Sequence, residues 1–167
     1  NLFAERKLDA KPSQIKVSNF FIILVLLFLA YAVRFIYSDL LYLAAQSKQV
    51  PGGLFKTIEL ARHMTTNYDF SLSRLSLNLL RVNFSLGIVF FYFFCESLFS
   101  GKDGIFYKGK LLLVSLISLG VSLLSTGRTE LLGLVAGYAI VYMLFFSKYY
   151  SWKDSRYGVK LFRSLLI

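Results

Sequence analysis

Four apolar segments, each close to the length of a membrane-spanning helix, constrain this chain more than any other feature of its sequence. They cover residues 20–37, 82–99, 110–125 and 130–147. A helix needs about 20 mostly apolar residues to cross the roughly 30 Å hydrocarbon layer of a bilayer, and its backbone must satisfy its own hydrogen bonds there. Both prolines, Pro12 and Pro51, fall outside the four segments. We therefore predict an all-α, polytopic transmembrane helix bundle with about four spans.

The composition supports this prediction and argues against a soluble domain. Hydrophobic residues make up 56% of the 167 residues and charged residues 17%, whereas soluble domains average roughly 45–50% and about 25%. The lone cysteine, Cys95, lies within the second apolar segment and has no disulfide partner in this sequence. The sequence contains no CxxC or HExxH motif and no cluster of His, Asp and Glu. We therefore expect neither a bound metal nor a cofactor.

The net charge of +10 gives the four segments a direction. Lys and Arg are concentrated in residues 1–19, 102–110 and 148–167. Four spans place these regions on one side of the membrane, and the positive-inside rule makes that side the cytoplasm. We predict a cytoplasmic segment over 1–19, a transmembrane domain over 20–147 with an outer loop at 38–81, and a basic cytoplasmic segment over 148–167 that can lead into a further span. The cations suit anionic lipid headgroups, and we do not expect nucleic acid as a partner.

The outer loop is expected to contain short helices of its own. Pro51-Gly52-Gly53 predicts a turn, residues 54–65 can form a short helix, and from Ser71 a second helix is predicted to continue into the second span. Polar residues on this second helix recur at steps of three and four, which places them on one face. The residues on this face are Ser71, Arg74, Asn78, Arg81 and Ser85. Arg74 and Arg81 lie two turns apart, about 10 Å along the helix axis.

The polar turn between the last two spans, residues 125–130, allows two interpretations. In the first it only connects two helices: Gly127 permits a tight turn, Thr129 caps the following helix, and Glu130 suits the positive end of that helix. In the second, Arg128 and free backbone N–H groups at the helix N-terminus form an anion-binding site. The residue pattern alone leaves both open.

A resemblance to a known family enters at this turn. The residues from Ser125, Ser-Thr-Gly-Arg-Thr-Glu-Leu-Leu-Gly-Leu, continue into Val135-Ala-Gly-Tyr-Ala-Ile-Val-Tyr. This run resembles the Gly-Arg-Thr helix start of bacterial oligosaccharide repeat unit polymerases, the O-antigen and capsular polysaccharide polymerases. The preceding order, an Arg-bearing outer loop followed by an aromatic span and a tight helix pair, is similar too, so that the resemblance extends over residues 20–147. Members of this family have ten or more spans, which leads us to expect that the chain is a piece of a longer membrane protein.

The resemblance implies a reaction, its location and its partners. Such polymerases join glycan repeats linked to undecaprenyl diphosphate at the outer face of the bacterial inner membrane. The growing chain leaves its diphosphate for a sugar hydroxyl on the next lipid-linked repeat. The implied partners are these lipid-linked glycans, membrane lipids and a regulator of chain length. Arg128 matches the family motif and is implied to be catalytic, because an arginine can stabilise a leaving diphosphate bidentately at any physiological pH.

Further candidates follow from their predicted positions. We predict that Arg62, Arg74 and Arg81, all in the outer loop, bind substrate together with Thr129, which follows Arg128.

The sequence leaves the roles of Arg34 and His63 open. Arg34 lies near the outer end of the first span, where it can bind substrate or simply extend to the interface. His63, the only histidine, is a candidate general base because histidine ordinarily titrates near neutral pH, although a lone histidine in a loop can equally be solvated. Asp69 and Glu59 are alternative bases.

Other functions remain open at this stage. A transporter that flips the same lipid-linked glycans would carry charged residues within its spans, whereas the charged candidates here gather at the predicted outer rim. A non-catalytic membrane component of the same pathway is a third possibility. A membrane O-acyltransferase would need an intramembrane histidine, which the sequence lacks.

The last apolar segment also contains a packing signal. Gly133 and Gly137 form a Gly-x-x-x-Gly step, which lets two membrane helices approach closely. We expect this step to mark helix packing within the chain, and a dimer interface is the alternative.

Overall fold

The computed structural model describes residues 16–47, 49, 52–100 and 103–149, and these form five helices. The helices are α1 (Asn19–Gln46), α2 (Leu54–Asn67), α3 (Arg74–Ser100), α4 (Ile105–Ser122) and α5 (Arg128–Tyr149). Four of them, all except α2, are long and apolar enough to cross a membrane. The predicted fold class is confirmed: the chain is a multi-pass membrane protein, an all-α bundle of four candidate spans with one shorter helix.

Two helices, α1 and α3, begin at residues other than those predicted, because capping side chains set where they start. Ser18 caps α1, because its Oγ accepts a hydrogen bond from the backbone N of Phe21 at 3.2 Å. α3 begins at Arg74, three residues after the predicted start at Ser71, because the Oγ of Ser73 accepts a hydrogen bond from the N of Ser76. A serine oxygen in this position satisfies one of the free N–H groups of the first turn.

The bundle is organised around α3, which packs against α1, α4 and α5. At Gly87 the packing is tight enough to exclude a side chain: a Cβ atom there would lie 2.9 Å from the Tyr138 hydroxyl and 3.1 Å from the Cβ of Ser118. On α5, a Cβ at Gly133 would meet the ring of Phe84, and one at Gly137 would meet Ile88. The Gly-x-x-x-Gly step therefore packs against α3 of the same chain, as expected.

Polar side chains connect the spans where the core is otherwise apolar. The buried Asn83 of α3 donates from Nδ2 to the carbonyl oxygen of Ser118 at 3.0 Å and to the hydroxyl of Ser122 at 3.1 Å, both on α4. Tyr138 of α5 donates its hydroxyl hydrogen to the carbonyl oxygen of Ser115 at 2.8 Å. Hydrogen bonds of this kind hold membrane helices together where burial of apolar surface no longer favours association.

The outward faces of the spans suit lipid. Large apolar side chains are exposed along each of the four, for example Phe20 at 76% on α1, Leu116 at 57% on α4 and Leu132 at 64% on α5. A water-soluble protein rarely exposes such continuous apolar surface, whereas hydrocarbon accommodates it.

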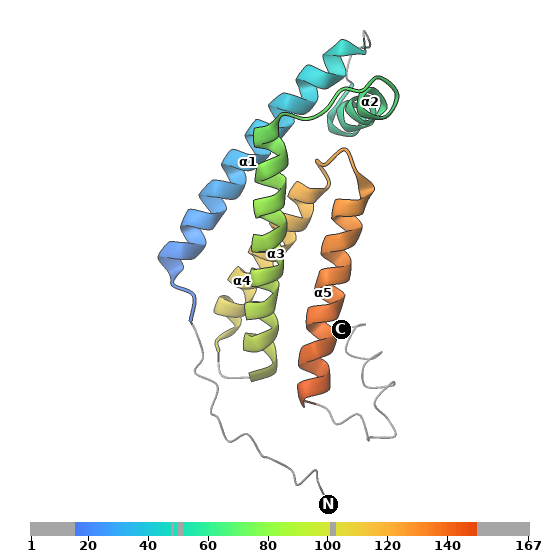
Figure 1. Cartoon of the computed structure of the whole chain (residues 1–167). Coiled ribbons are helices and arrows are strands. Elements are labelled where there is room, and N and C mark those ends of the chain that lie inside the picture. Colours follow the sequence, from blue (N-terminus) through green and yellow to red (C-terminus); the bar gives the residue numbers. More distant parts are fainter. Residues whose placement is uncertain (1–15, 48, 50–51, 101–102, 150–167) are drawn as a thin grey trace, which may run out of the picture.

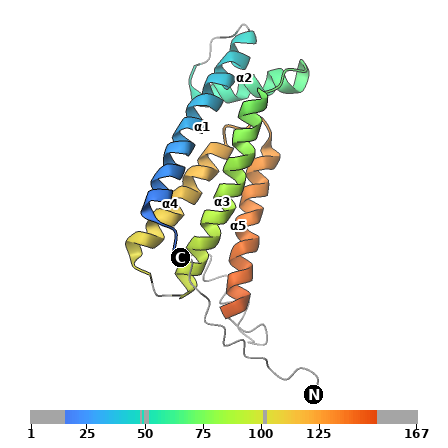
Figure 2. The ribbon, with the colours of Figure 1, turned by 60° about the vertical axis from the view of Figure 1, so that its left-hand side comes forward.

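One end of the bundle is closed by α2, and we call it the α2 end. Figure 1 and Figure 2 both show α2 lying across the helix axes, above the turn between α4 and α5. α1 and α3 have 28 and 27 residues, whereas α4 has 18. At 1.5 Å per residue, α1 and α3 are about 40 Å long and α4 is about 27 Å. In both views the end of α1 extends past the α4–α5 turn, and α2 lies above this turn (Figure 1, Figure 2).

At the opposite end, the start of α1 is attached to the start of α4. Lys110 Nζ donates to Asn19 Oδ1 at 3.1 Å, and the N of Val17 donates to the Tyr107 hydroxyl at 2.8 Å. Lys16 pairs with Asp103 at 3.7 Å. The described lysines of the predicted cytoplasmic regions thus share one end. Residues 1–15, 101–102 and 150–167 lie outside the described part of the chain.

We predict that Gly87→Ala destabilises the bundle by about 1–3 kcal/mol, because the added methyl group overpacks the contact among α3, α4 and α5. Gly120→Ala on α4 is the matched control, since a Cβ there meets nothing within 4 Å and its effect should stay within about 1 kcal/mol. Thermal unfolding of the purified protein in detergent measures both. Equal unfolding midpoints for the two variants would contradict this packing.

Candidate functional site

The α4–α5 turn is held in a defined shape by its own side chains. The buried Ser125 donates its hydroxyl hydrogen to the carbonyl oxygen of Gly127 at 2.6 Å. α5 begins at Arg128, so that Thr129 lies inside the first helical turn with an exposed side chain. The prediction that Thr129 caps this helix is therefore wrong, because the chain becomes helical one residue before it. The structure describes the backbone of Arg128 but not its side chain.

Arg62 of α2 reaches this turn. Its Nε donates to the carbonyl oxygen of Thr126 at 2.9 Å, across 64 residues of sequence. Within α2, the Thr65 hydroxyl donates to the carbonyl oxygen of Arg62 at 2.9 Å. A guanidinium has five N–H donors, and this bond uses one of them. Arg62 therefore fixes α2 over the turn and keeps most of its hydrogen-bonding capacity.

Arg81 meets the same turn region from α3. Together with Leu80, Phe84, Ser85 and Glu130 it lines a pocket of about 290 Å³. The Ser85 hydroxyl donates back to the carbonyl oxygen of Arg81 at 3.2 Å. Two of the polar residues predicted to share one face of this helix, Arg81 and Ser85, thus lie beside the first turn of α5.

Glu130 is the residue of this pocket whose role the sequence did not reveal. The pattern explained it as a favourable charge at a helix N-terminus, and it does lie in the first turn of α5. One of its carboxylate oxygens, Oε2, is buried and accepts no hydrogen bond from any described residue. Arg81 and Glu130 form no ion pair with each other or with another described residue. A buried carboxylate oxygen without a partner is costly.

The other predicted site residues lie elsewhere. Arg74 is exposed at the start of α3 and makes no hydrogen bond or ion pair with the described residues. Arg34 is exposed on α1, about 22 Å along the helix from Asn19 by helix rise, and it likewise has no such partner in the described ranges. Asp39 does not pair with Arg34 but accepts a hydrogen bond from the N of Ser73 at 2.8 Å, which attaches the start of α3 to α1.

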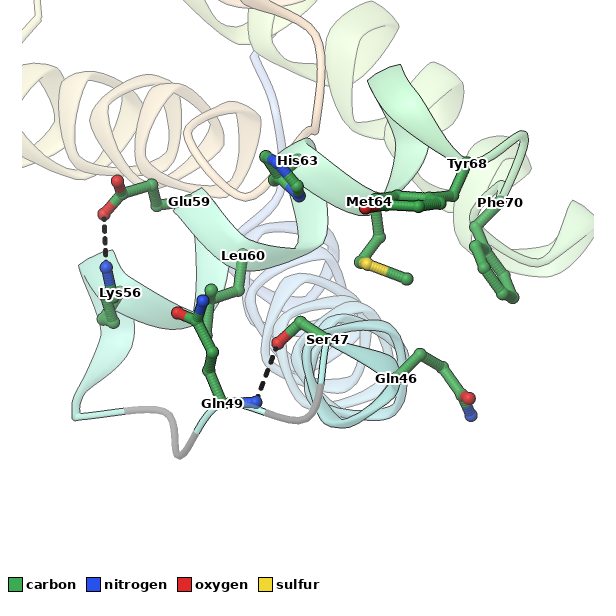
Figure 3. Close-up of a pocket in the computed structure, with 10 residues that line it drawn as sticks. All are labelled: Gln46, Ser47, Gln49, Lys56, Glu59, Leu60, His63, Met64, Tyr68 and Phe70. Atoms are coloured by element: carbon green, nitrogen blue, oxygen red, sulfur yellow. Dashed lines mark hydrogen bonds and ion pairs between the residues drawn. The ribbon is translucent and has the colours of Figure 1, made fainter.

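His63 lies in a second cavity, between α2 and the end of α1 (Figure 3). Its ring is 5.7 Å from the ring of Tyr68, centroid to centroid. Glu59, an alternative base from the sequence, lines the same cavity. Neither residue lines the pocket that contains Arg81 and Glu130. The structure therefore separates the predicted residues into an arginine-bearing region at the turn and a second cavity on α2.

Within the described ranges no group of three His, Cys, Asp or Glu side chains is arranged to hold a metal ion. The polar chemistry of the turn region is that of guanidinium, carboxylate and hydroxyl groups. This set can neutralise an anion and accept a proton from a neutral hydroxyl.

Comparison with known proteins identifies no relative: no protein family, no curated protein and no solved structure matches this chain.

We predict that Arg62→Ala loosens α2 from the turn. Loss of a hydrogen bond from a charged donor removes about 1.5–3 kcal/mol, so backbone amides of α2 should exchange with deuterium at least about tenfold faster. Arg74→Ala removes the same charge from an exposed site and is the control. Unchanged exchange in Arg62→Ala would show that this bond does not hold α2.

Proposed function

We propose that this chain polymerises undecaprenyl-diphosphate-linked oligosaccharide repeats into O-antigen or capsular polysaccharide at the outer face of the bacterial inner membrane. The observation that carries the proposal is the bond from Arg62 to Thr126. It brings an arginine from the predicted outer loop onto the segment that resembles the polymerase motif. Arg81 lines a pocket with Glu130 of the same segment. In this proposal the α2 end is the outer end.

The reaction requires a stabilised leaving group. The hydroxyl oxygen of the acceptor sugar forms a bond to the anomeric carbon of the growing chain, and the bond from that carbon to the diphosphate oxygen breaks. The diphosphate leaves with additional negative charge while it stays attached to its lipid. Arg62, Arg81 and Arg128 are assigned to bind it, because guanidinium groups pair with phosphate oxygens bidentately and stay charged.

The acceptor hydroxyl must also lose a proton. The carboxylate of Glu130 is assigned this role, since Glu130 lines the pocket together with Arg81. A carboxylate beside an arginine can accept the proton as the new bond forms. His63, the base suggested by the sequence, lines the other cavity. Arg128 stays in the proposal through its position at the start of α5, and Arg34 and Arg74 have no assigned role at the turn.

Loss of the gene distinguishes the proposed function from its alternatives. A polymerase predicts that single repeats accumulate on their lipid or acceptor and that no polymer forms, as seen on a gel of surface glycan. A flippase for the same lipids predicts that repeats disappear from the outer surface altogether. An unchanged surface glycan would contradict both functions.

Complementation of that strain with variants extends the same experiment to the site. Arg81→Gln, Glu130→Gln and Arg128→Ala should each fail to restore long chains although the protein inserts at normal levels. Lys110→Gln removes a charge at the opposite end of the bundle, far from the site, and this variant should restore long glycan chains. Normal chain lengths with Glu130→Gln would remove Glu130 from the mechanism.

A further inference from the structure

The cavity between α2 and the end of α1 has a chemistry that differs from the turn. Its volume is about 660 Å³, which falls within the roughly 300–1,000 Å³ typical of small-molecule sites. Figure 3 shows that its walls come from the end of α1, from one face of α2 and from the segment that follows α2. The wall residues that matter for the argument are Gln46, Gln49, Lys56, Glu59, His63 and Tyr68.

The charges of this cavity compensate one another. Lys56 Nζ and Glu59 Oε2 lie 3.4 Å apart, as an exposed pair on successive turns of α2. The described charged side chains of the wall are thus one lysine and one carboxylate that pair with each other, whereas Arg81 and Glu130 of the other pocket form no ion pair with a described residue. The paired charges suit a ligand without net charge.

The uncharged lining offers both hydrogen-bond donors and acceptors. The side-chain amides of Gln46 and Gln49 form no hydrogen bond with the described residues, and each carries a carbonyl oxygen and an NH₂ group. The Ser47 hydroxyl between them is already used, because it donates to the carbonyl oxygen of Ala44 at 2.6 Å and accepts from the N of Gln49. Figure 3 shows the two amides on opposite sides of Ser47, and each matches a hydroxyl group of a ligand, which both donates and accepts.

An aromatic surface completes the wall. Tyr68 ends α2, and the chain turns at Asp69, which has a positive φ of 55°. This turn lets Tyr68 and Phe70 both line the cavity. The Tyr68 side chain is 59% exposed and lies against the His63 ring. A tyrosine presents an apolar face with a polar tip, and a sugar ring has the complementary form, with an apolar C–H face and hydroxyl groups at its edge.

We propose that this cavity binds the saccharide part of the substrate, as a subsite for uncharged sugar units that is separate from the diphosphate site. The inference rests on the proposed function for the identity of the glycan. Both sites belong to α2, whose Arg62 contacts the turn while His63 and Glu59 face the cavity. A lipid-linked glycan has its charged diphosphate at the membrane surface and its sugars in the water beyond. The two sites follow the same order, with arginines at the turn and hydrogen-bonding and aromatic groups in the cavity beside α2.

The test is direct binding of a glycan that lacks both lipid and phosphate. The probe is the neutral oligosaccharide repeat released from the surface polysaccharide of the source bacterium, added to the purified full chain in nanodiscs. Saturation-transfer NMR detects contacts even at millimolar affinity. We expect binding that Tyr68→Ala weakens at least tenfold, that Gln49→Ala weakens, and that Tyr68→Phe largely retains. Phe55→Ala is the control, because Phe55 is exposed on α2 and does not line the cavity.

Each outcome decides the proposal. If the folded wild-type protein shows no transfer to the oligosaccharide, or if Tyr68→Ala binds it as tightly as the wild type, the cavity is not a saccharide site. If inorganic diphosphate displaces the oligosaccharide, the cavity binds anions and the proposed separation of sites is wrong. None of these results depends on polymerisation, so the loss-of-gene experiment can fail while this subsite stands, and the reverse also holds.

Discussion

The need to hydrogen-bond every backbone group inside hydrocarbon determines most of this structure. A chain that crosses a bilayer must be helical there, and a span must reach from one interface to the other. The four apolar helices meet this requirement with different lengths: α3 has 27 residues and α4 has 18. At one end α1 extends past the α4–α5 turn, and α2 lies across the bundle above this turn (Figure 1).

The same end holds the described residues that meet the turn. Arg62 fastens α2 to the turn through its bond to the Thr126 carbonyl, and Arg81 and Glu130 line a pocket at the first turn of α5. Below this region the helices are closely packed, with Asn83 bonded to α4 and Gly87 in close contact with α4 and α5. In the proposed function, this packing supports the site that orients the lipid-linked substrate for transfer.

The lengths and the spacing of the apolar segments predicted the fold, because the bilayer sets how long and how apolar a membrane span must be. The four spans, the short helix in the loop and the internal role of Gly133 and Gly137 could all be read from spacing. The site could be predicted only in part. Arg62 and Arg81 were identified as loop arginines, but Arg62 meets the turn, 64 residues later in the sequence, through the way α2 folds back over the bundle. Arg81 meets the first turn of α5 through the packing of α3 against α5. Glu130 looked like a helix-end charge because its burial and missing partner are tertiary properties, and Thr129 looked like a cap because capping patterns do not fix a helix start to one residue.

The central claim is that the α2 end of the bundle faces the outside of the cell membrane, and thiol labelling of spheroplasts tests it most directly. The background is Cys95→Ala, since Cys95 is a buried residue and the only cysteine. Single cysteines are placed at the exposed Thr66 of α2 and at the exposed Gly104 before α4. The account predicts that a membrane-impermeant maleimide labels Thr66→Cys in intact spheroplasts and labels Gly104→Cys only after permeabilisation. The reverse pattern would place the α2 end in the cytoplasm and contradict the account.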